Sequence, residues 1–479
     1  MSLKRNLISG VLWTALGKYS GMIISIIISM VLARLISPEQ FGVVAIAQVT
    51  ISFFSIFSDL GIGAAIVQNK TLTKRNLDSI FSYTIILALI LSFTFLGVSP
   101  LIASFYKNPE LTNVCRLLAV DLFFNTITVV PSALFNKNKR FKYIAKRSLL
   151  FQVFFGLISI IYAFCGGGVY TLVIPPIFSS FCLFIVNLYE YPRRFDWSLN
   201  IEPLKRIFSF SFYQFLFGVV NYISRNLDKL IIGKSLDMKS LGYYQKSYSL
   251  MMLPLGNLTY VITPVLQPYL SDYQDDLDFI KDKYFKMIKV LSILGVSIGI
   301  FFSSTSGELI RIFYGAGWDL AIPPFTILSL SIPLQIILST TGSIFQSTNN
   351  TKLLFITGII NTLIVMSSFV ICGVLHGSIV MYAYAWNIAC IFNFCIAFFI
   401  LLRFVFCAKI SELICNLKHA FLYALFLSIV VLLIHFFLLE VSVVISLFIK
   451  TVVIIISILL VNYFLKDFNL SSILKKIKN

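Results

Sequence analysis

The sequence predicts an all-α protein that crosses a membrane many times. Of its 479 residues, 58% are hydrophobic and only 12% are charged, whereas a soluble globular protein carries about 25% charged residues. Apolar runs such as "MIISIIISMVLA" and "TVVIIISILLVNYFL" lie in windows of about 20 residues, the length that an α-helix needs to cross a bilayer core. Composition and run length together therefore exclude a water-soluble globular protein.

Fourteen apolar windows, bounded by polar residues or by Pro and Gly, are predicted to be membrane-spanning helices. The first follows the basic start "MSLKRN" and is too long for a cleavable signal, so we expect it to be a span. Glycines 166–168 separate the fifth window from the sixth and predict a tight hairpin. The windows cover residues 9–33, 40–67, 78–105, 113–135, 146–165, 168–189, 206–233, 241–269, 287–313, 320–345, 353–375, 378–402, 418–438 and 442–465.

The basic residues predict the orientation of these spans. Most of the 38 Lys and Arg residues fall in segments on the same side as the N-terminus. Outside the spans, the opposite side holds only Arg34, Lys107, Lys234 and Lys239. Because Lys and Arg are enriched on the cytoplasmic side of a membrane, both termini are predicted to be cytoplasmic. The net charge of +18 then faces anionic lipid rather than nucleic acid.

An internal repeat predicts two lobes. The segment "ARLISPEQFGVVAIAQ" (33–48) aligns with "GKSLDMKSLGYYQKSY" (233–248) at an offset of 200, which pairs Gly42 with Gly242. Two further matches follow in the same order, so the repeat unit is about six spans. Six is an even number, so the copies are predicted to be parallel repeats around a central cleft. The predicted parts are an N-terminal lobe (1–195), a C-terminal lobe (196–403) and two appended spans with a basic tail (404–479).

Three charges in the seventh span are the strongest candidate site. Arg225, Asp228 and Lys229 stand at i, i+3 and i+4 in "ISRNLDKLIIGKSL", so they share one helix face. A charge in mid-bilayer costs about 2.5 kcal/mol or more. Asp228 can neutralise one cation and leaves one positive charge over. Lys18 lies near the middle of the first span, and the repeat offset places it about two turns before Arg225.

These charges allow two interpretations. They are salt bridges between helices together with side chains that reach the membrane surface, or they line a positive, water-filled cavity that holds an anion. Lys246 in the eighth span is expected to add to that cavity. Asp59 in the second span is either a coupling-ion site or a local helix contact. Arg116 with Asp121, and Glu308 with Arg311, are expected to be local pairs, and Lys450 has no partner that the sequence reveals.

Several classes of chemistry lack their sequence signatures. The chain contains no GxxxxGK[ST] loop for ATP, and its three histidines show no metal spacing. Eight scattered cysteines form no CxxC pair and are expected to be small buried hydrophobes. No loop is long enough to fold as a catalytic domain. The sequence therefore predicts a transporter that is not an enzyme and needs no cofactor or metal.

Two segments carry a family resemblance. "LARLISPEQFGVVAIAQVTISFFSIFSDLGIGAAIVQ" (32–68) and "NLDKLIIGKSLDMKSLGYYQKSYSLMMLP" (226–254) resemble the two signatures of Wzx-like polysaccharide flippases. These proteins share a superfamily with multidrug and toxin extruders and with the lipid II flippase. The resemblance covers essentially the whole chain. It implies fourteen helices, alternating access, and transfer of undecaprenyl-diphosphate-linked oligosaccharide to the periplasmic leaflet of the bacterial inner membrane.

The resemblance also implies partners and a role for the charges. Lys18, Arg225, Lys229 and Lys246 are expected to contact the diphosphate, and Asp59 and Asp228 to be charges of the cavity or of a coupling site. A polysaccharide polymerase and H⁺ or Na⁺ are further expected partners. Two alternatives stay open, an extruder of cationic drugs and a membrane-embedded glycosyltransferase. The first predicts an acidic cleft, and the second a large loop or an acid-rich catalytic site.

Overall fold

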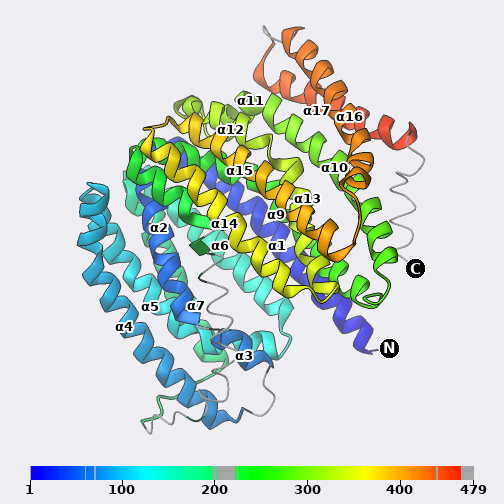
Figure 1. The fold of residues 1–479 in the computed structure, drawn as a ribbon. Coiled ribbons are helices and arrows are strands. Elements are labelled where there is room, and N and C mark those ends of the chain that lie inside the picture. The colour runs from blue at the N-terminus through cyan, green and yellow to red at the C-terminus, as the bar shows by residue number, and fades with distance from the viewer. Residues whose placement is uncertain are drawn as a thin grey trace. The chain divides into compact units, whose positions relative to one another are not determined.

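The computed structural model describes the backbone of residues 2–59, 61–68, 72–197, 202, 219, 222–223, 225–437 and 441–464. Every regular element in these ranges is helical, so the predicted all-α class is confirmed for this part of the chain. The chain divides into two compact units, Met1–Gly242 and Tyr243–Asn479. Figure 1 shows their helices, coloured along the chain.

The first unit contains long helices joined by short turns. Residues 225–235 are also helical, and the helix that follows them continues into the second unit. The elements are α1 (Ser2–Leu35), α2 (Pro38–Asp59), α3 (Ile62–Gln68), α4 (Lys74–Tyr106), α5 (Glu110–Lys137), α6 (Phe141–Phe164), η1 (Gly168–Leu172), α7 (Ile174–Glu190) and the start of α9 (Met238–Ser271).

The second unit contains the rest of α9 and shorter, more often broken helices. They are α10 (Leu277–Ser304), α11 (Ser306–Phe313), η2 (Ala316–Ala321), α12 (Ile322–Ser329), α13 (Ile332–Ser347), α14 (Thr351–Val374), α15 (Ile379–Ile400), η3 (Leu401–Val405), α16 (Ile410–Phe437) and α17 (Val443–Phe464).

Within the described residues, eleven helices are long and apolar enough to cross a membrane, and the bent pair formed by η2–α12 and α13 raises this number to twelve. The chain is therefore a multi-pass membrane protein. The seventh predicted span (206–233) lies mostly outside the described residues, and α9 occupies the eighth. The number fourteen and the six-helix lobes stay predictions.

Three predicted spans are broken in the structure. The second (40–67) divides into α2 and α3 at Gly61, whose φ of 72° suits a residue without a Cβ. The ninth (287–313) divides into α10, which begins earlier than expected, and the short α11. The tenth (320–345) bends by 53° between α12 and α13. A proline in the first turn of α13 lacks the N–H that would continue the preceding helix.

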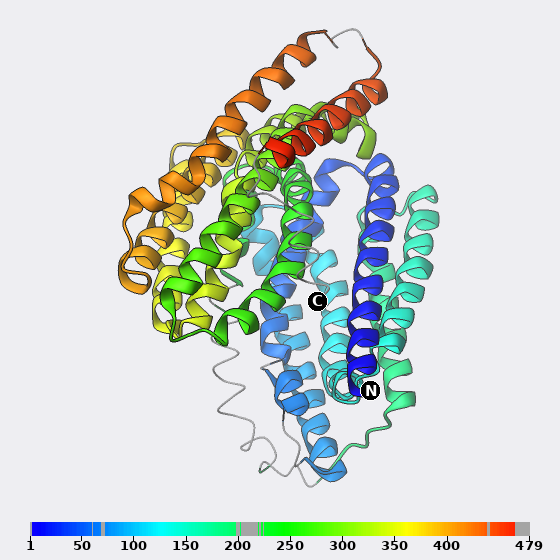
Figure 2. The same ribbon diagram turned by 90° about the vertical axis from the view of Figure 1, so that its right-hand side faces the viewer.

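Small residues let helices of the first unit approach closely. A Cβ added at Gly17 would lie 2.9 Å from Cβ of Ala145, and Gln152 donates a hydrogen bond to the carbonyl of Gly21 at 2.7 Å. Gly156 leaves room for Ile28 further along the same pair of helices. These contacts hold α1 against α6 along most of their length, as Figure 2 shows. Such small-residue contacts are typical of helix packing in membranes.

The N-terminal ends of α2 and α9 meet even more tightly, and the contact is reciprocal. A Cβ added at Gly42 would lie 1.7 Å from the carbonyl oxygen of Met238, and one added at Gly242 would lie 1.9 Å from that of Pro38. The repeat offset of 200 pairs Pro38 with Met238 and Gly42 with Gly242. The two residues of each pair therefore exchange the same contact, as in an interface with two-fold symmetry.

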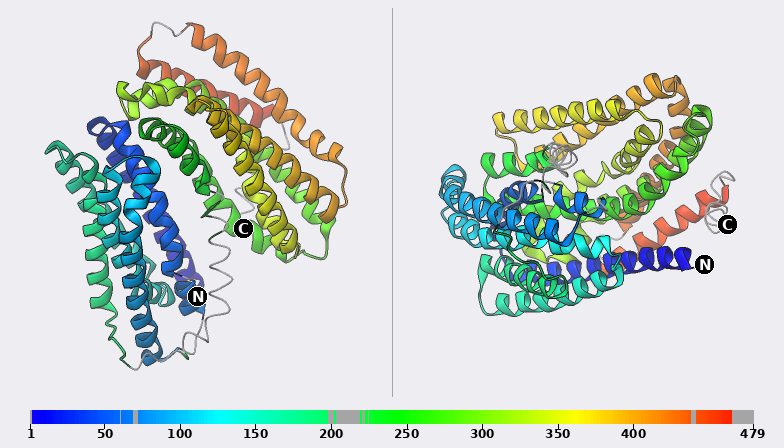
Figure 3. Two further views of the ribbon diagram at one scale, coloured as in Figure 1. Left: turned by 60° about the vertical axis from the view of Figure 1, so that its left-hand side comes forward. Right: turned by 90° about the horizontal axis from the view of Figure 1, so that it is seen from below.

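Apolar clusters stabilise each unit. In the first, Ile66, Phe81 and Leu134 belong to a buried cluster of α3, α4 and α5; α4 and α5, light blue and cyan in Figure 3, pack along their length. In the second, Val296, Leu427 and Ile454 belong to a cluster of α10, α16 and α17, which lie together in Figure 1. The two C-terminal helices thus share a core with α10.

Candidate functional site

The charged stretch 222–235 is positioned by α2 and by the end of α4. The Tyr222 hydroxyl donates to the Val49 carbonyl, and the Tyr106 hydroxyl donates to the Leu230 carbonyl at 3.4 Å. Lys234 donates to the carbonyl of Phe105 at 2.5 Å and lies 4.1 Å from the centre of that residue's ring. Hydrogen bonds at both ends of the stretch therefore hold it against α2 and the end of α4.

The three candidate charges of this stretch have different surroundings. Asp228 is buried, with 2% of its surface exposed. Arg225 is exposed, and Lys229 is half-buried. The Lys229 ammonium donates to the Asn226 side chain at 3.1 Å, a neighbour that adds no negative charge. The helix thus presents an exposed guanidinium and a half-buried ammonium on the side where sequence periodicity groups them.

Lys18 and Asp59 lie on the first two helices. Lys18 is half-buried on α1, next to Gly17, where α1 meets α6. Asp59 is the last residue of α2, and its side chain lies outside the described residues. Their roles as a diphosphate contact and as a coupling or cavity charge stay predictions.

Lys246 lies in the second unit, in an aromatic enclosure formed by α9 and the region around η2. Its ammonium lies 5.0 Å from the ring centre of Tyr314 and 6.0 Å from that of Trp318, distances at which a cation is attracted by an aromatic face. The Tyr243 ring meets Trp318 edge to face, and Ser247 donates to the Ala321 carbonyl at 2.8 Å. With 7% of its surface exposed, Lys246 is a buried cation held by rings.

The expected pair between Glu308 and Arg311 is wrong. Arg311 makes a bidentate ion pair with Asp319, at 3.0 and 3.1 Å. Glu308 instead accepts hydrogen bonds from Lys450 and, at 2.8 Å, from Ser446, both on α17. Lys450 is fully buried and also donates to the Ser304 carbonyl at 2.9 Å.

The sequence does not reveal this contact between α11 and α17, the α11–α17 junction, because Glu308 and Lys450 are far apart in sequence. Lys450 stood out as a charge inside an apolar run, but no spacing rule reaches from α17 back to α11. The expected pair of Arg116 and Asp121 is also not formed among the described side chains; Asp121 accepts a hydrogen bond from Asn125 at 2.9 Å instead.

The described residues contain no group of three or more His, Cys, Asp or Glu side chains that could hold a metal ion. The candidate cations are Lys18, Arg225 and Lys229 in the first unit, and Lys246 among aromatic rings in the second. Such groups attract anions strongly where the dielectric constant is low.

Comparison with known proteins identifies the family. A model of the "Polysaccharide biosynthesis protein" family matches residues 31–323. The chain belongs to this family. The match covers α2 through η2 and includes both segments that carry the resemblance found in the sequence.

Two curated relatives extend the match over most of the chain. "Teichuronic acid biosynthesis protein TuaB" of Bacillus subtilis (strain 168) is 23% identical over 82% of each chain. "Lipopolysaccharide biosynthesis protein WzxC" of Escherichia coli (strain K12) is 24% identical and covers 79% of this chain and 77% of its own. The Wzx-like resemblance is therefore confirmed.

A solved structure shows the same fold. The "Lipid II flippase MurJ, inward closed conformation" superposes with a TM-score of 0.75 at 17% identity, and covers 95% of this chain and 99% of its own. At that identity the similarity concerns the fold alone. The all-helical membrane architecture predicted from hydropathy is thus that of a known flippase.

Proposed function

We propose that this protein moves an undecaprenyl-diphosphate-linked oligosaccharide from the cytoplasmic to the periplasmic leaflet of a bacterial inner membrane, for the synthesis of a surface polysaccharide. Membership of the polysaccharide biosynthesis family, in a chain that crosses the membrane many times, carries the proposal. The protein catalyses no bond cleavage in this scheme. Both termini face the cytoplasm, as the distribution of Lys and Arg indicates.

The membrane cations supply the chemistry for binding the lipid-linked substrate. A diphosphate carries negative charge through a medium where bare charge is costly, and cations offset that cost. Arg225 can bind two phosphate oxygens with its planar guanidinium, whereas Lys18, Lys229 and Lys246 act as point charges. Asp228 balances part of the positive charge, so that the anion can also leave.

Transfer requires the site to open to the two leaflets in turn. The internal repeat in the sequence predicts parallel six-helix lobes, and transporters built from such repeats alternate their access by rocking one repeat against the other. In this scheme Asp59 is the candidate residue for a coupling ion, H⁺ or Na⁺. A polymerase that receives the flipped repeat unit is the expected protein partner.

A strain that lacks the gene tests the function. Undecaprenyl-diphosphate-linked glycans are quantified beside surface polysaccharide. Accumulation of complete repeat units with loss of surface polysaccharide identifies the lost step as translocation. Normal lipid-linked glycans together with raised sensitivity to cationic drugs would instead identify a drug extruder and overturn the proposal.

A matched pair of substitutions tests the cations. Arg225→Ala removes an exposed guanidinium from the charged stretch and is expected to abolish export at normal membrane expression. Lys239→Ala removes an exposed cation fourteen residues further along, outside that stretch, and is expected to leave export unchanged. Undiminished surface polysaccharide in the Arg225 variant would contradict its assignment to the diphosphate.

A further inference from the structure

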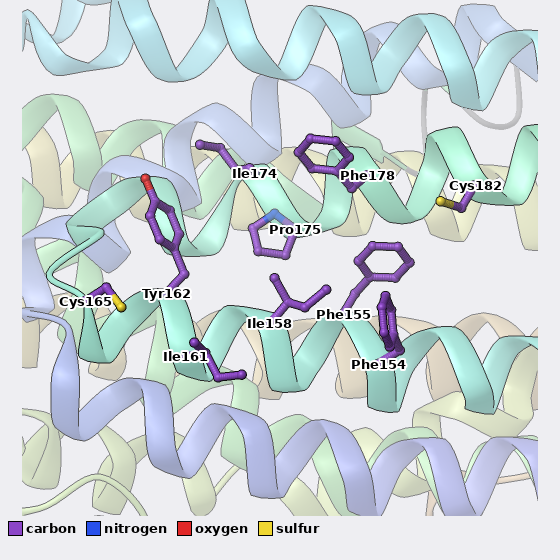
Figure 4. Close-up of a pocket in the computed structure, with 10 residues that line it drawn as sticks. All are labelled: Phe154, Phe155, Ile158, Ile161, Tyr162, Cys165, Ile174, Pro175, Phe178 and Cys182. Atoms are coloured by element: carbon purple, nitrogen blue, oxygen red, sulfur yellow. The ribbon is translucent and has the colours of Figure 1, made fainter.

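The hairpin of α6 and α7 contains an apolar groove of about 590 Å³ (Figure 4). Phe154, Phe155 and Ile158 line it from α6, and Pro175 and Phe178 line it from α7. The exposed lining surface is apolar, and the residues Phe154 and Phe178 are each 55% exposed. The groove is therefore partly open at the surface of the hairpin, and its apolar lining suits a hydrocarbon chain.

The groove exists because α6 and α7 are joined firmly only near their ends. At one end the glycine turn and η1 connect them. At the other, Arg147 donates to Asn187 and Arg140 pairs with Glu190; the hydrogen bond to Glu190 raises the pKa of Arg140. Between these ends, large aromatic and branched side chains face each other and leave space that small residues would have closed.

The end of α6 near its N-terminus carries exposed cations. The ammonium groups of Lys142 and Lys146 lie 5.2 and 5.8 Å from the ring centre of Trp13 on α1, and both side chains are exposed. Two positive charges close to one indole ring form a suitable binding site for a multivalent anion. Because no residue from 148 to 189 is charged, this hairpin offers cations to a lipid headgroup at one end only.

An exposed apolar stripe connects the cations to the groove. Leu150, Val153 and Phe154 are 63%, 42% and 55% exposed and follow Lys146 along α6. At about 1.5 Å per residue, the groove runs from roughly 12 Å (Phe154) to roughly 28 Å (Cys165) beyond Lys146. Half of a bilayer core is only about 15 Å, so an ordinary acyl chain anchored at the lysines reaches little more than the near end.

We propose that this groove binds the polyprenyl chain of the lipid-linked substrate, while its diphosphate rests on Lys142 and Lys146 before translocation. The proposal rests on the proposed function and adds to it a loading site on the first unit. A long isoprenoid chain passes the bilayer midplane, as the depth of the groove requires. The lysines lie on the predicted cytoplasmic side, where the lipid-linked unit is made available.

Photolabelling of the full-length protein in lipid vesicles tests the loading site. One probe is an undecaprenyl-diphosphate disaccharide with a diazirine in its chain, and the other is phosphatidylglycerol with a diazirine in an acyl chain. The polyprenyl probe is expected to label the peptides that contain Phe154–Cys182. Excess unlabelled phosphatidylglycerol is expected not to displace it.

Two groove-filling variants and a matched control sharpen the result. Ile158→Trp narrows the groove from α6, and Cys182→Trp narrows it from α7. Each is expected to reduce polyprenyl labelling about tenfold, because the steric cost of overpacking lowers affinity by about that factor. Leu157→Trp adds the same ring at a neighbouring, 54% exposed position that does not line the groove. Its labelling is expected to stay at the wild-type level.

Two results would overturn the loading site. One is phosphatidylglycerol labelling the groove while the polyprenyl probe does not, and the other is unchanged polyprenyl labelling in both groove-filling variants. Either leaves the proposed function standing if the deletion strain still accumulates lipid-linked repeat units. Normal lipid-linked glycans in that strain would instead remove the proposed function itself.

Discussion

The junction of α11 with α17 and the hairpin of α6 with α7 use charge in opposite ways. In the first, Lys450 is fully buried and its ammonium meets the Glu308 carboxylate and the Ser304 carbonyl. In the second, Lys142 and Lys146 stand exposed over Trp13, on the same helix that lines an open apolar groove further along. In the α11–α17 junction the charges are buried and paired with each other, whereas in the α6–α7 hairpin they are exposed at one end.

The difference separates structural charges from charges available to a ligand. A buried cation that is bonded to a carboxylate already has its partner inside the protein, and removing either group leaves an uncompensated buried charge. Exposed cations on a helix that also lines an apolar groove offer their charge to another molecule. Unusual charge in a membrane sequence is therefore not evidence of a substrate site until its surroundings are known.

The largest expected effect on stability comes from breaking the buried pair of Lys450 and Glu308. Lys450→Met leaves the Glu308 carboxylate without its cation and is expected to destabilise the protein by about 3–5 kcal/mol. Thermal unfolding in detergent measures this loss. The double variant Glu308→Met with Lys450→Met removes both charges and is expected to recover most of the stability; equal instability of single and double variants would contradict the assignment of Lys450 and Glu308 as a buried pair.

The close contact of α2 with α9 at Gly42 and Gly242 is a second tightly packed contact between helices. Gly42→Ala places a methyl group 1.7 Å from a backbone carbonyl oxygen and is expected to cost about 3 kcal/mol, at the upper end of overpacking effects. Gly156→Ala adds the same methyl group 2.1 Å from the end of the Ile28 side chain, which can change rotamer. The comparison is made by thermal unfolding, and an equal loss in both variants would show that the α2–α9 backbones can separate freely.

Substitutions of the exposed lysines Lys142 and Lys146 are expected to weaken ligand binding without changing the stability of the protein. Each of Lys142→Gln and Lys146→Gln is expected to weaken binding of the polyprenyl-diphosphate probe by about 1 kcal/mol, roughly fivefold, with an unchanged unfolding temperature. Lys352→Gln, at an exposed cation on α14, is the control and is expected to leave probe binding unchanged. A large fall in unfolding temperature in the Lys142 and Lys146 variants would make those lysines structural.

The smallest effect on stability is expected at a glycine that makes no close contact with another helix. A Cβ at Gly358, in the middle of α14, meets no atom within 4 Å. Gly358→Ala is therefore expected to stabilise the protein by about 0.5–1 kcal/mol, because alanine loses less conformational entropy in a helix. A measured destabilisation would mean that another molecule packs against α14 at this position.

The sequence predicted the helices better than the contacts between their charges. Apolar windows correspond to α1, α4–α7 and α14–α17, and the offset that pairs Gly42 with Gly242 also marks residues that touch. The breaks at Gly61 and between α12 and α13 were missed, because hydropathy continues through them. The pair of Glu308 with Arg311 was wrong, and the partner of Lys450 was missed, because both assignments depended on sequence distance alone.

Sequence alone determined that this chain is a multi-pass helical protein, because hydrophobicity and helical hydrogen bonding are local properties. It also singled out Lys18, Arg225, Asp228 and Lys229 as costly charges, since that cost depends on position within an apolar run. Only the tertiary structure decided that Lys450 is paired with Glu308, and that α6 and α7 leave a groove further along the hairpin from Lys142 and Lys146. Those outcomes depend on which side chains fill the space between helices, and this is set by packing between distant segments.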